Sequence, residues 1–304
     1  MNAKKEKVDL IPILLMGGLF VLIDLLALLV TKPFEAAGAV AFVNPSDWSN
    51  LVFFFSILIV FTALILLIAK FGLKRLIQGI FLGSIGILGA YVFYPLLSPV
   101  LPEFWTLGLS IAFSAILVLT LMRYPEWWVL DISGVITAVG SIAMIGISLI
   151  IPIVIVLLIV MALYDAISVY KTKHMIDLAD TLIDLKLPIL FVIPKKGSYS
   201  LIKETKGLKE KLKEGEKREA FFLGLGDVVL PGILAASAFH YLPSNSLLVA
   251  SSVMLGTLIG FALLMAFVVK GKPQAGLPFL CPGAILGYVV SSYLLFGGIV
   301  GLSF

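Results

Sequence analysis

Long apolar stretches alternate with short polar or basic connections along almost the whole chain. With Gly, Pro and clusters of charge as boundaries, this pattern predicts nine membrane spans of roughly 20 residues each. The spans lie at about residues 10–31, 51–69, 76–97, 104–122, 128–148, 152–170, 220–240, 246–269 and 279–300. Backbone groups inside hydrocarbon must find their hydrogen bonds within the segment, so the spans are expected to be α-helices. The predicted fold class is therefore an all-α polytopic membrane protein.

Positive charge indicates how these spans are oriented. Of the 22 Lys and Arg residues, 21 lie before the first span or in every second connection after it, and Lys32 lies on the opposite side. Cytoplasmic connections carry an excess of Lys and Arg. The N-terminus is therefore predicted to be cytoplasmic, and nine spans place the C-terminus outside.

The chain is predicted to form a single membrane domain over residues 1–304. Spans one to six occupy about 10–170, a long cytoplasmic loop follows at 171–219, and spans seven to nine occupy about 220–300. No internal repeat with a period of about 20 to 50 residues divides the domain further.

The long loop contains three kinds of sequence. Apolar residues at helical spacing predict a short amphipathic helix on the membrane surface; they are Met175, Leu178, Leu182 and Leu185. The apolar run 188–194 is far too short to span, so it is expected to be an extended segment that lies on the membrane surface or on the protein. Residues 203–218 alternate Lys and Glu and are predicted to form a solvated linker.

Composition removes whole classes of function. The chain is 61% hydrophobic and 13% charged, with a net charge of only +4 over 304 residues. A soluble enzyme, a nucleic-acid binder and a secreted disulfide-bonded protein are excluded, because none contains so many long apolar stretches. The single Cys281 and two His residues are too few for a zinc or haem site, so neither a metal nor an organic cofactor is expected.

Four acidic residues lie within the predicted spans, where charge is costly and often marks a functional site. They are Asp24, Asp131, Asp165 and Asp227, and the spans contain no Lys or Arg to pair with them. Asp131 follows two Trp residues at a span end and is interpreted as a structural acid in the first helical turn. Asp24 is interpreted as a neutral acid that is hydrogen-bonded to a neighbouring helix.

Asp165 and Asp227 are different because they lie at similar depth. Asp165 is near the cytoplasmic end of the sixth span, and Asp227 is near the cytoplasmic start of the seventh. Two carboxyls that meet in a low dielectric share one proton, so one can act as a base on water while the other donates to a carbonyl oxygen. This pairing predicts the chemistry of an aspartyl protease.

Glycines and a proline surround the two acids. Gly224 and Gly226 precede Asp227, and glycine lets another backbone approach closely. Pro278 opens the ninth span at a comparable depth and is expected to keep its first turn irregular. Two further pairs, Gly256 with Gly260 and Gly283 with Gly287, are interpreted as helix-packing motifs.

Three short motifs resemble those of the presenilin and signal peptide peptidase family, known as GxGD intramembrane aspartyl proteases. They are Tyr164-Asp165 in the sixth span, Gly224-Leu225-Gly226-Asp227 in the seventh and Pro278-Phe279-Leu280 at the start of the ninth. The resemblance implies a nine-helix protease with Asp165 and Asp227 as its catalytic pair. It also implies that the other seven residues of these motifs bind substrate or shape the site.

The sequence departs from the family pattern in two respects. Phe279 stands where the family usually has a small Ala, which changes the expected shape of the substrate groove. The chain is also shorter than typical eukaryotic members and lacks their long variable segments. A prokaryotic, archaeal homologue in the plasma membrane is therefore expected.

The hypothesis from sequence is an aspartic endopeptidase that cleaves within transmembrane segments of other proteins. Its expected partners are transmembrane-helix protein substrates and the lipid bilayer, with no nucleic acid, and a homo-oligomer stays open. One alternative is a prepilin or preflagellin peptidase, which also uses Gly-x-Gly-Asp. A second is a proton-coupled transporter that uses the two acids as proton carriers.

Overall fold

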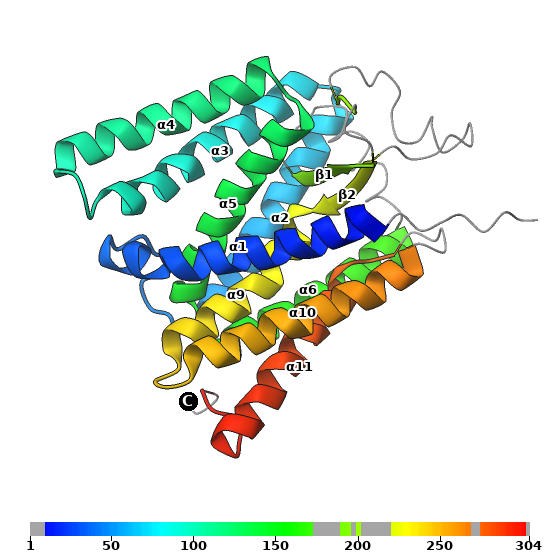
Figure 1. Cartoon of the computed structure of the whole chain (residues 1–304). Coiled ribbons are helices and arrows are strands. Elements are labelled where there is room, and N and C mark those ends of the chain that lie inside the picture. Colours follow the sequence, from blue (N-terminus) through cyan, green and yellow to red (C-terminus); the bar gives the residue numbers. More distant parts are fainter. Residues whose placement is uncertain (1–9, 173–188, 196–198, 202–219, 269–273, 302–304) are drawn as a thin grey trace, which may run out of the picture.

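The computed structural model describes residues 10–172, 189–195, 199–201, 220–268 and 274–301 (Figure 1). Within them the chain forms nine α-helices, a π-helix and two strands. The helices are α1 (Leu10–Ala36), α2 (Ser49–Lys70), α3 (Lys74–Leu97), α4 (Glu103–Arg123), α5 (Trp127–Ser148), α6 (Ile151–Ile167), α9 (Leu225–Tyr241), α10 (Ser246–Val268) and α11 (Leu277–Phe296). The π-helix η1 (Ser168–Thr172) continues α6, and the strands are β1 (Leu190–Pro194) and β2 (Ala220–Gly224).

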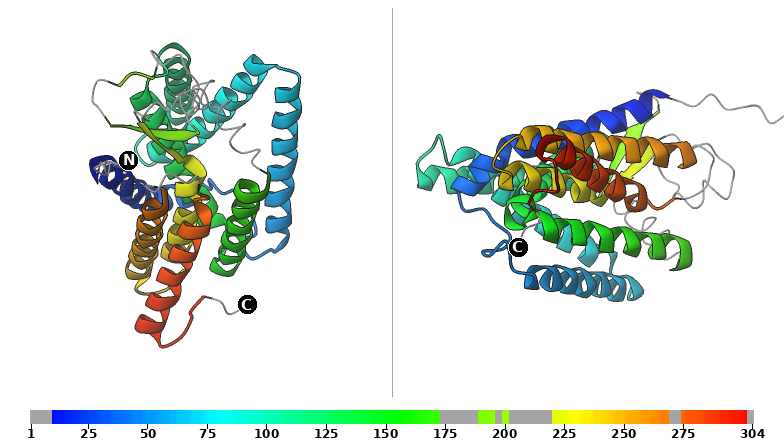
Figure 2. Two further views of the ribbon diagram at one scale, coloured as in Figure 1. Left: turned by 90° about the vertical axis from the view of Figure 1, so that its right-hand side faces the viewer. Right: turned by 90° about the horizontal axis from the view of Figure 1, so that it is seen from below.

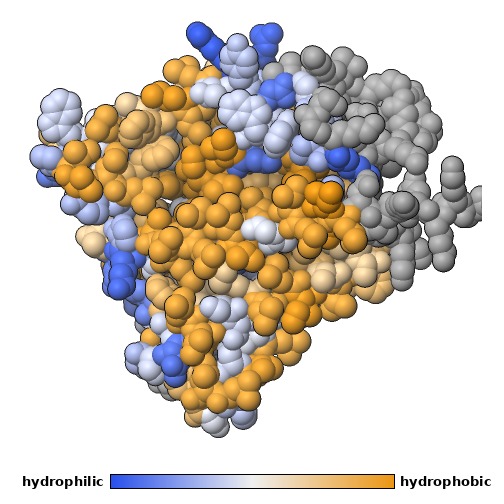
Figure 3. Space-filling model, viewed as in Figure 1, coloured by the Kyte–Doolittle hydropathy of each residue, from blue (hydrophilic) through white to orange (hydrophobic). Residues whose placement is uncertain are grey.

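The helices have the length and surface of membrane spans. Eight are long and apolar enough to cross a membrane, when α6 is counted together with its continuation in η1 as far as Tyr170, and α9 is a shorter apolar helix of 17 residues. Figure 3 shows apolar residues across most of one face, with hydrophilic residues gathered toward its margins. Large apolar side chains are exposed on several helices, including Leu29 of α1, Ile59 of α2 and Leu255 of α10. Such a surface is typical of lipid contact, and the prediction of an all-helical polytopic membrane protein is confirmed.

Helix α9 lies at the centre of the bundle. It packs against α1, α5, α6, α10 and α11, whereas α3 and α4 form a pair at one flank and α2 contacts α3 at the periphery (Figures 1 and 2). Val228, Ile233 and Leu234 of α9 are fully buried. The core of the protein therefore surrounds the helix that carries Asp227.

Helices α10 and α11 approach so closely that their glycines are required. A Cβ atom added to Gly256 would lie 2.1 Å from the Gly283 carbonyl oxygen, and one added to Gly287 would lie 2.2 Å from the Ser252 carbonyl oxygen. A Cβ on Gly260 would lie 2.3 Å from the Phe279 carbonyl oxygen. The structure confirms that these glycines are packing motifs, because only hydrogen fits between the two backbones.

The two strands form an antiparallel hairpin beside the start of α9. Leu190 pairs with Gly224 at one end and Pro194 pairs with Ala220 at the other. The Leu225 N–H donates to the Ile189 carbonyl oxygen at 2.9 Å, so the pairing continues into the first residue of α9. The prediction of an extended segment at 188–194 is confirmed for its described part, which lies on the protein.

The hairpin corrects the predicted start of the seventh span. Residues 220–224, expected to be helical, form β2 because they pair with β1, and the helix begins at Leu225. Asp227 is therefore the third residue of α9 instead of lying about two turns inside a longer helix. The predicted amphipathic helix at 175–185 and the linker at 203–218 lie outside the described residues.

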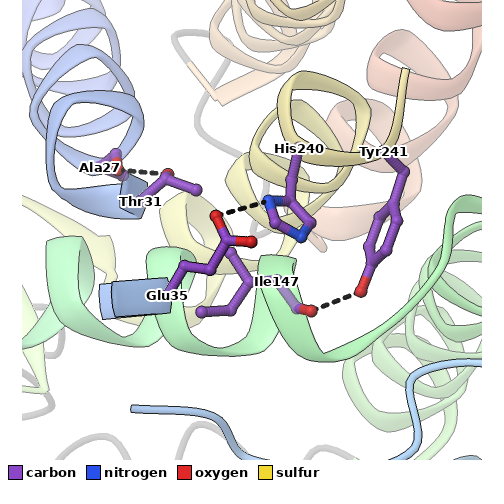
Figure 4. A network of polar contacts seen from close by, with 6 residues as sticks. All are labelled: Ala27, Thr31, Glu35, Ile147, His240 and Tyr241. Carbon is purple, nitrogen blue, oxygen red and sulfur yellow. Dashed lines mark hydrogen bonds and ion pairs between the residues drawn. The ribbon is translucent and has the colours of Figure 1, made fainter. Parts of the chain in front are cut away.

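The far end of α9 is held by a separate polar network (Figure 4). His240 Nδ1 lies 3.7 Å from Glu35 Oε2 at the end of α1. The Tyr241 hydroxyl donates to the Ile147 carbonyl oxygen of α5. Contacts at both ends of α9, the hairpin at one and this network at the other, therefore fix its position along the bundle.

Candidate active site

Asp165 lies near the end of α6 and is almost completely buried, with 7% of its surface exposed. The backbone N–H of Leu277, the first residue of α11, donates to Asp165 Oδ2 at 3.1 Å. Gly276, the residue directly before Leu277, lies beside the other acid, Asp227. The start of α11 therefore supplies the hydrogen-bond donor that orients Asp165.

Asp227 lies in the first turn of α9, against two glycines. A Cβ atom on Gly276 would lie 2.8 Å from Asp227 Oδ2 and 2.9 Å from Oδ1. A Cβ on Gly224 would lie 3.1 Å from Oδ2, and the Gly224 backbone N–H bonds to the carboxylate. Both glycines leave room for the carboxylate in its present position, and a Cβ on Gly276 would displace it.

The two carboxylates meet at one dipeptide. Leu277 contacts Asp165 through its N–H, and the adjacent Gly276 contacts Asp227 through its Cα face. The acids are also close enough to interact electrostatically. Helices α6 and α9, whose acids are 62 residues apart in sequence, thus present their carboxyls to the same point at the start of α11.

This arrangement is suited to acid–base chemistry on a water molecule. Two carboxyls held together share one proton, so one can accept a proton while the other donates. Among the described residues, no group of three or more His, Cys, Asp or Glu side chains is placed to hold a metal ion.

The glycines of the Gly-x-Gly-Asp motif have different surroundings. Leu225 continues the hairpin pairing, and Gly224 contacts Asp227. A Cβ on Gly226 would meet nothing within 4 Å, and the residue is exposed. Space is therefore open at Gly226, the residue directly before Asp227 in the first turn of α9.

The third predicted motif, residues 278–280, lies directly after the two residues that contact the acids. Pro278 is the second residue of α11, where a missing N–H costs nothing, so the first turn is regular and the expected irregularity is wrong. Phe279 packs its ring on Phe267 of α10, and Leu280 is fully buried. Gly276 and Leu277, directly before the motif, make the contacts with the two acids.

Two further residues extend the description of the site. Tyr164, next to Asp165 in sequence, is 43% exposed on the surface of α6. Cys281, which the sequence singled out only as the single cysteine, is fully buried and lies within electrostatic range of both acids. Cys281 lies one helical turn after Leu277 on α11, and this spacing could have predicted from the sequence that it lies near the acids.

A second hydrogen bond, which does not involve the acids, joins the segment after α6 to the segment before α11. The Tyr170 hydroxyl of η1 donates to Gln274 Oε1 at 2.7 Å. Tyr170 follows Asp165 by five residues, and Gln274 precedes Gly276 by two. The bond therefore helps to hold the start of α11 against the end of α6.

The remaining two acids have separate surroundings. Asp24 is 4% exposed, and its Oδ1 atom has no hydrogen-bond partner in the described part of the chain. Its expected hydrogen bond to a neighbouring helix is therefore not found at this atom, which lies against Gly232 of α9. Asp131 is the fifth residue of α5, just beyond the first turn in which it was expected, and it accepts a hydrogen bond from the Val192 N–H at 2.8 Å.

Comparisons with known proteins agree with this architecture. Residues 17–299 match the family model described as signal-peptide peptidase, presenilin aspartyl protease. The chain is similar to a solved structure of a presenilin family intramembrane aspartate protease in the C222 space group. The TM-score is 0.70 and the identity 32%, and the match covers 93% of this chain and 99% of that chain.

A second solved structure gives the same result. It is described as a presenilin family intramembrane aspartate protease in the P2 space group, with a TM-score of 0.66 and 31% identity. The match covers 92% of this chain and 96% of that chain. The comparison with curated proteins found no match.

Proposed function

The chain belongs to the signal-peptide peptidase and presenilin family of intramembrane aspartyl proteases, and on this premise we propose that Asp165 and Asp227 are its catalytic pair. The substrates are transmembrane segments of other membrane proteins. The single observation that carries the proposal is the meeting of both carboxylates at Gly276 and Leu277. The apolar exposed helices make the chain an integral multi-pass membrane protein, and we place it in the plasma membrane of a prokaryote.

The proposed reaction is hydrolysis by an activated water molecule. One carboxylate accepts a proton from water as the water oxygen attacks the carbonyl carbon, and the other carboxyl donates its proton to the carbonyl oxygen. The tetrahedral intermediate then breaks its C–N bond as the first carboxyl gives the proton taken from water to the leaving nitrogen, and a hydroxyl of the intermediate returns a proton to the other carboxylate. The products are one new carboxyl group and one new amine, and no cofactor is consumed.

The substrate must lose local helix before it can be cut, because a helical peptide bond is shielded by its own turn. Its freed backbone groups then need new partners inside the membrane. In the described residues, β2 is paired only with β1, which leaves its other edge available for strand addition. The open space beside Gly226 supports an approach of the substrate past this edge to Asp227.

The direct test is incubation of the purified protein with a model transmembrane peptide. We expect cleavage that is blocked by a transition-state-analogue inhibitor of aspartyl proteases, because such compounds mimic the tetrahedral intermediate. Cleavage of a pilin-like leader at the membrane surface alone would instead favour the prepilin peptidase. Proton-dependent solute uptake in proteoliposomes without proteolysis would favour the transporter.

The pH profile of cleavage is expected to be bell-shaped. The pair must hold one proton to supply both a base and an acid, so activity falls when the pair is fully protonated or fully ionised. The measurement is kcat/KM for a model peptide across the pH range in which the protein stays folded. A flat profile over that range would argue against a proton-sharing pair.

The first cut is expected in the cytoplasmic third of the substrate span. Asp227 lies two residues after the first residue of α9, about 3 Å along the helix axis. Asp165 lies two residues before the end of α6, and η1 continues that helix for five more residues to Thr172. Both acids are therefore near the end of the bundle that the basic connections place in the cytoplasm.

Mass spectrometry of early products tests this expectation. Gly or polar residues in the cytoplasmic third of the substrate should speed the first cut, and a run of Leu should slow it, because Leu is a better helix former. Initial cleavage at the outer end of the substrate would contradict the predicted orientation or the assignment of the acids.

A further inference from the structure

Helix α5 holds strand β1 by two contacts one turn apart. The Val192 backbone N–H donates to Asp131 Oδ1 at 2.8 Å. The fully buried Phe191 ring lies on Gly134, where an added Cβ would be 2.8 Å from Cε1. Asp131 and Gly134 are three residues apart and thus share a helix face. One polar and one apolar contact therefore fix β1 on α5.

These contacts are connected to Asp227 by continuous pairing. Strand β1 pairs with β2 over five residue pairs, from Leu190 with Gly224 to Pro194 with Ala220. Strand β2 passes directly into α9, of which Asp227 is the third residue. A shift of β1 on α5 would therefore move β2 and the first turn of α9 with it.

We propose that Asp131 is a positioning residue for the reaction, which holds Asp227 in place through the hairpin. Asp131 is hydrogen-bonded to β1, β1 is paired with β2, and β2 continues directly into α9. The proposal rests on the proposed function, since it assigns Asp227 to catalysis. It gives a role in activity to an acid that its sequence position marked only as a helix-end residue.

The carboxylate is needed because its partner is deeply buried. Val192 is only 2% exposed, and its N–H points away from β2 toward α5. A buried backbone N–H that loses its acceptor destabilises the folded state by the full free energy of its desolvation. Strand β1 would then shift to find another acceptor. A carboxylate oxygen at this point also closes the outer edge of β1 to other strands.

The test compares two replacements of Asp131 in the full-length protein. Asp131→Asn keeps a side-chain oxygen that accepts the Val192 N–H, whereas Asp131→Leu has the same branched skeleton, is bulkier and has no acceptor. We expect Asp131→Leu to lower kcat by about 10- to 100-fold with little change in KM, because small misplacements of reacting groups are costly. Asp131→Asn should stay within about threefold of wild type, since it rescues the hydrogen bond that the proposal requires.

Amide hydrogen exchange supplies a readout that does not depend on activity. The amide hydrogens of residues 190–193 should exchange at least about tenfold faster in Asp131→Leu than in wild type or Asp131→Asn, because local opening is easier. Thr31→Val on α1, which removes a buried hydrogen bond within that helix, is the matched control. It should change neither kcat nor the exchange of β1.

Each outcome decides the proposal. Wild-type kcat in Asp131→Leu, a loss confined to KM, or an Asp131→Asn variant as impaired as Asp131→Leu would overturn it. If Asp131→Leu does not fold, Gly134→Ala displaces Phe191 and should also lower kcat, and normal kcat there would count against the proposal. Absence of any cleavage by wild type would refute the proposed function instead, while hydrogen exchange would still show whether Asp131 holds β1.

Discussion

Replacing either Asp165 or Asp227 with Asn is expected to reduce peptide-bond cleavage by about 10³-fold or more. Each carboxyl supplies a proton transfer that an amide cannot perform, and residues that act as one unit lose most of their activity when either is removed. Asn keeps the volume and can still accept the Leu277 N–H at Asp165, so the helices should stay assembled. The measurement is the initial cleavage rate of a model transmembrane peptide.

Asp24→Asn is the matched control for this prediction. Asp24 is also an acid inside the bundle, but it lies against Gly232, and no contact with the pair is found in the described residues. We expect it to cleave at close to the wild-type rate. Substantial turnover by the Asp165 or Asp227 variant would contradict the proposed mechanism, whatever the control shows.

Gly276→Ala is expected to lower activity by about 10²-fold while changing thermal stability little. The new Cβ would lie 2.8–2.9 Å from three atoms of the Asp227 carboxylate, closer than such contacts occur. The carboxylate is the end of a side chain, so it would rotate away instead of forcing the helices apart. A displacement of about 1 Å in a reacting group is enough for a loss of this size.

A glycine elsewhere in the bundle separates this effect from general disturbance. A Cβ on Gly83 of α3 would meet nothing within 4 Å, so Gly83→Ala should leave the cleavage rate unchanged. Thermal unfolding and gel filtration of both variants report whether they remain folded. A wild-type rate in Gly276→Ala would mean that Asp227 does not need the position it has in this structure.

Much of the fold was predictable because membrane spans have a strong local signal. Each of the nine predicted spans contains a helix, since about 20 apolar residues in a row leave few other structures possible. The start of the seventh span was not predictable in the same way. Residues 220–224 are apolar enough for a helix, and only their pairing with 190–194, across a long loop, makes them a strand.

The candidate site was predictable at the level of its acids and less so at the level of their contacts. Asp165 and Asp227 stand out because charge is rare in spans, and their similar depth follows from helix direction. Their common contact with Gly276 and Leu277 depends on how α11 lies against α6 and α9. Helix packing of this kind leaves no periodic signal. Pro278 drew attention to the correct segment, although the contacts precede it by one and two residues.

The most direct test of the central claim is mass spectrometry of peptide products formed in H₂¹⁸O. A transmembrane peptide would be incubated with wild type and with a variant in which Asp165 and Asp227 are both Asn. The account predicts that wild type alone forms products, and that for each cut the fragment with the new carboxyl group contains ¹⁸O while the fragment with the new amine does not, because water is the nucleophile. An intact peptide with wild type, or equal product formation by the double variant, would contradict it.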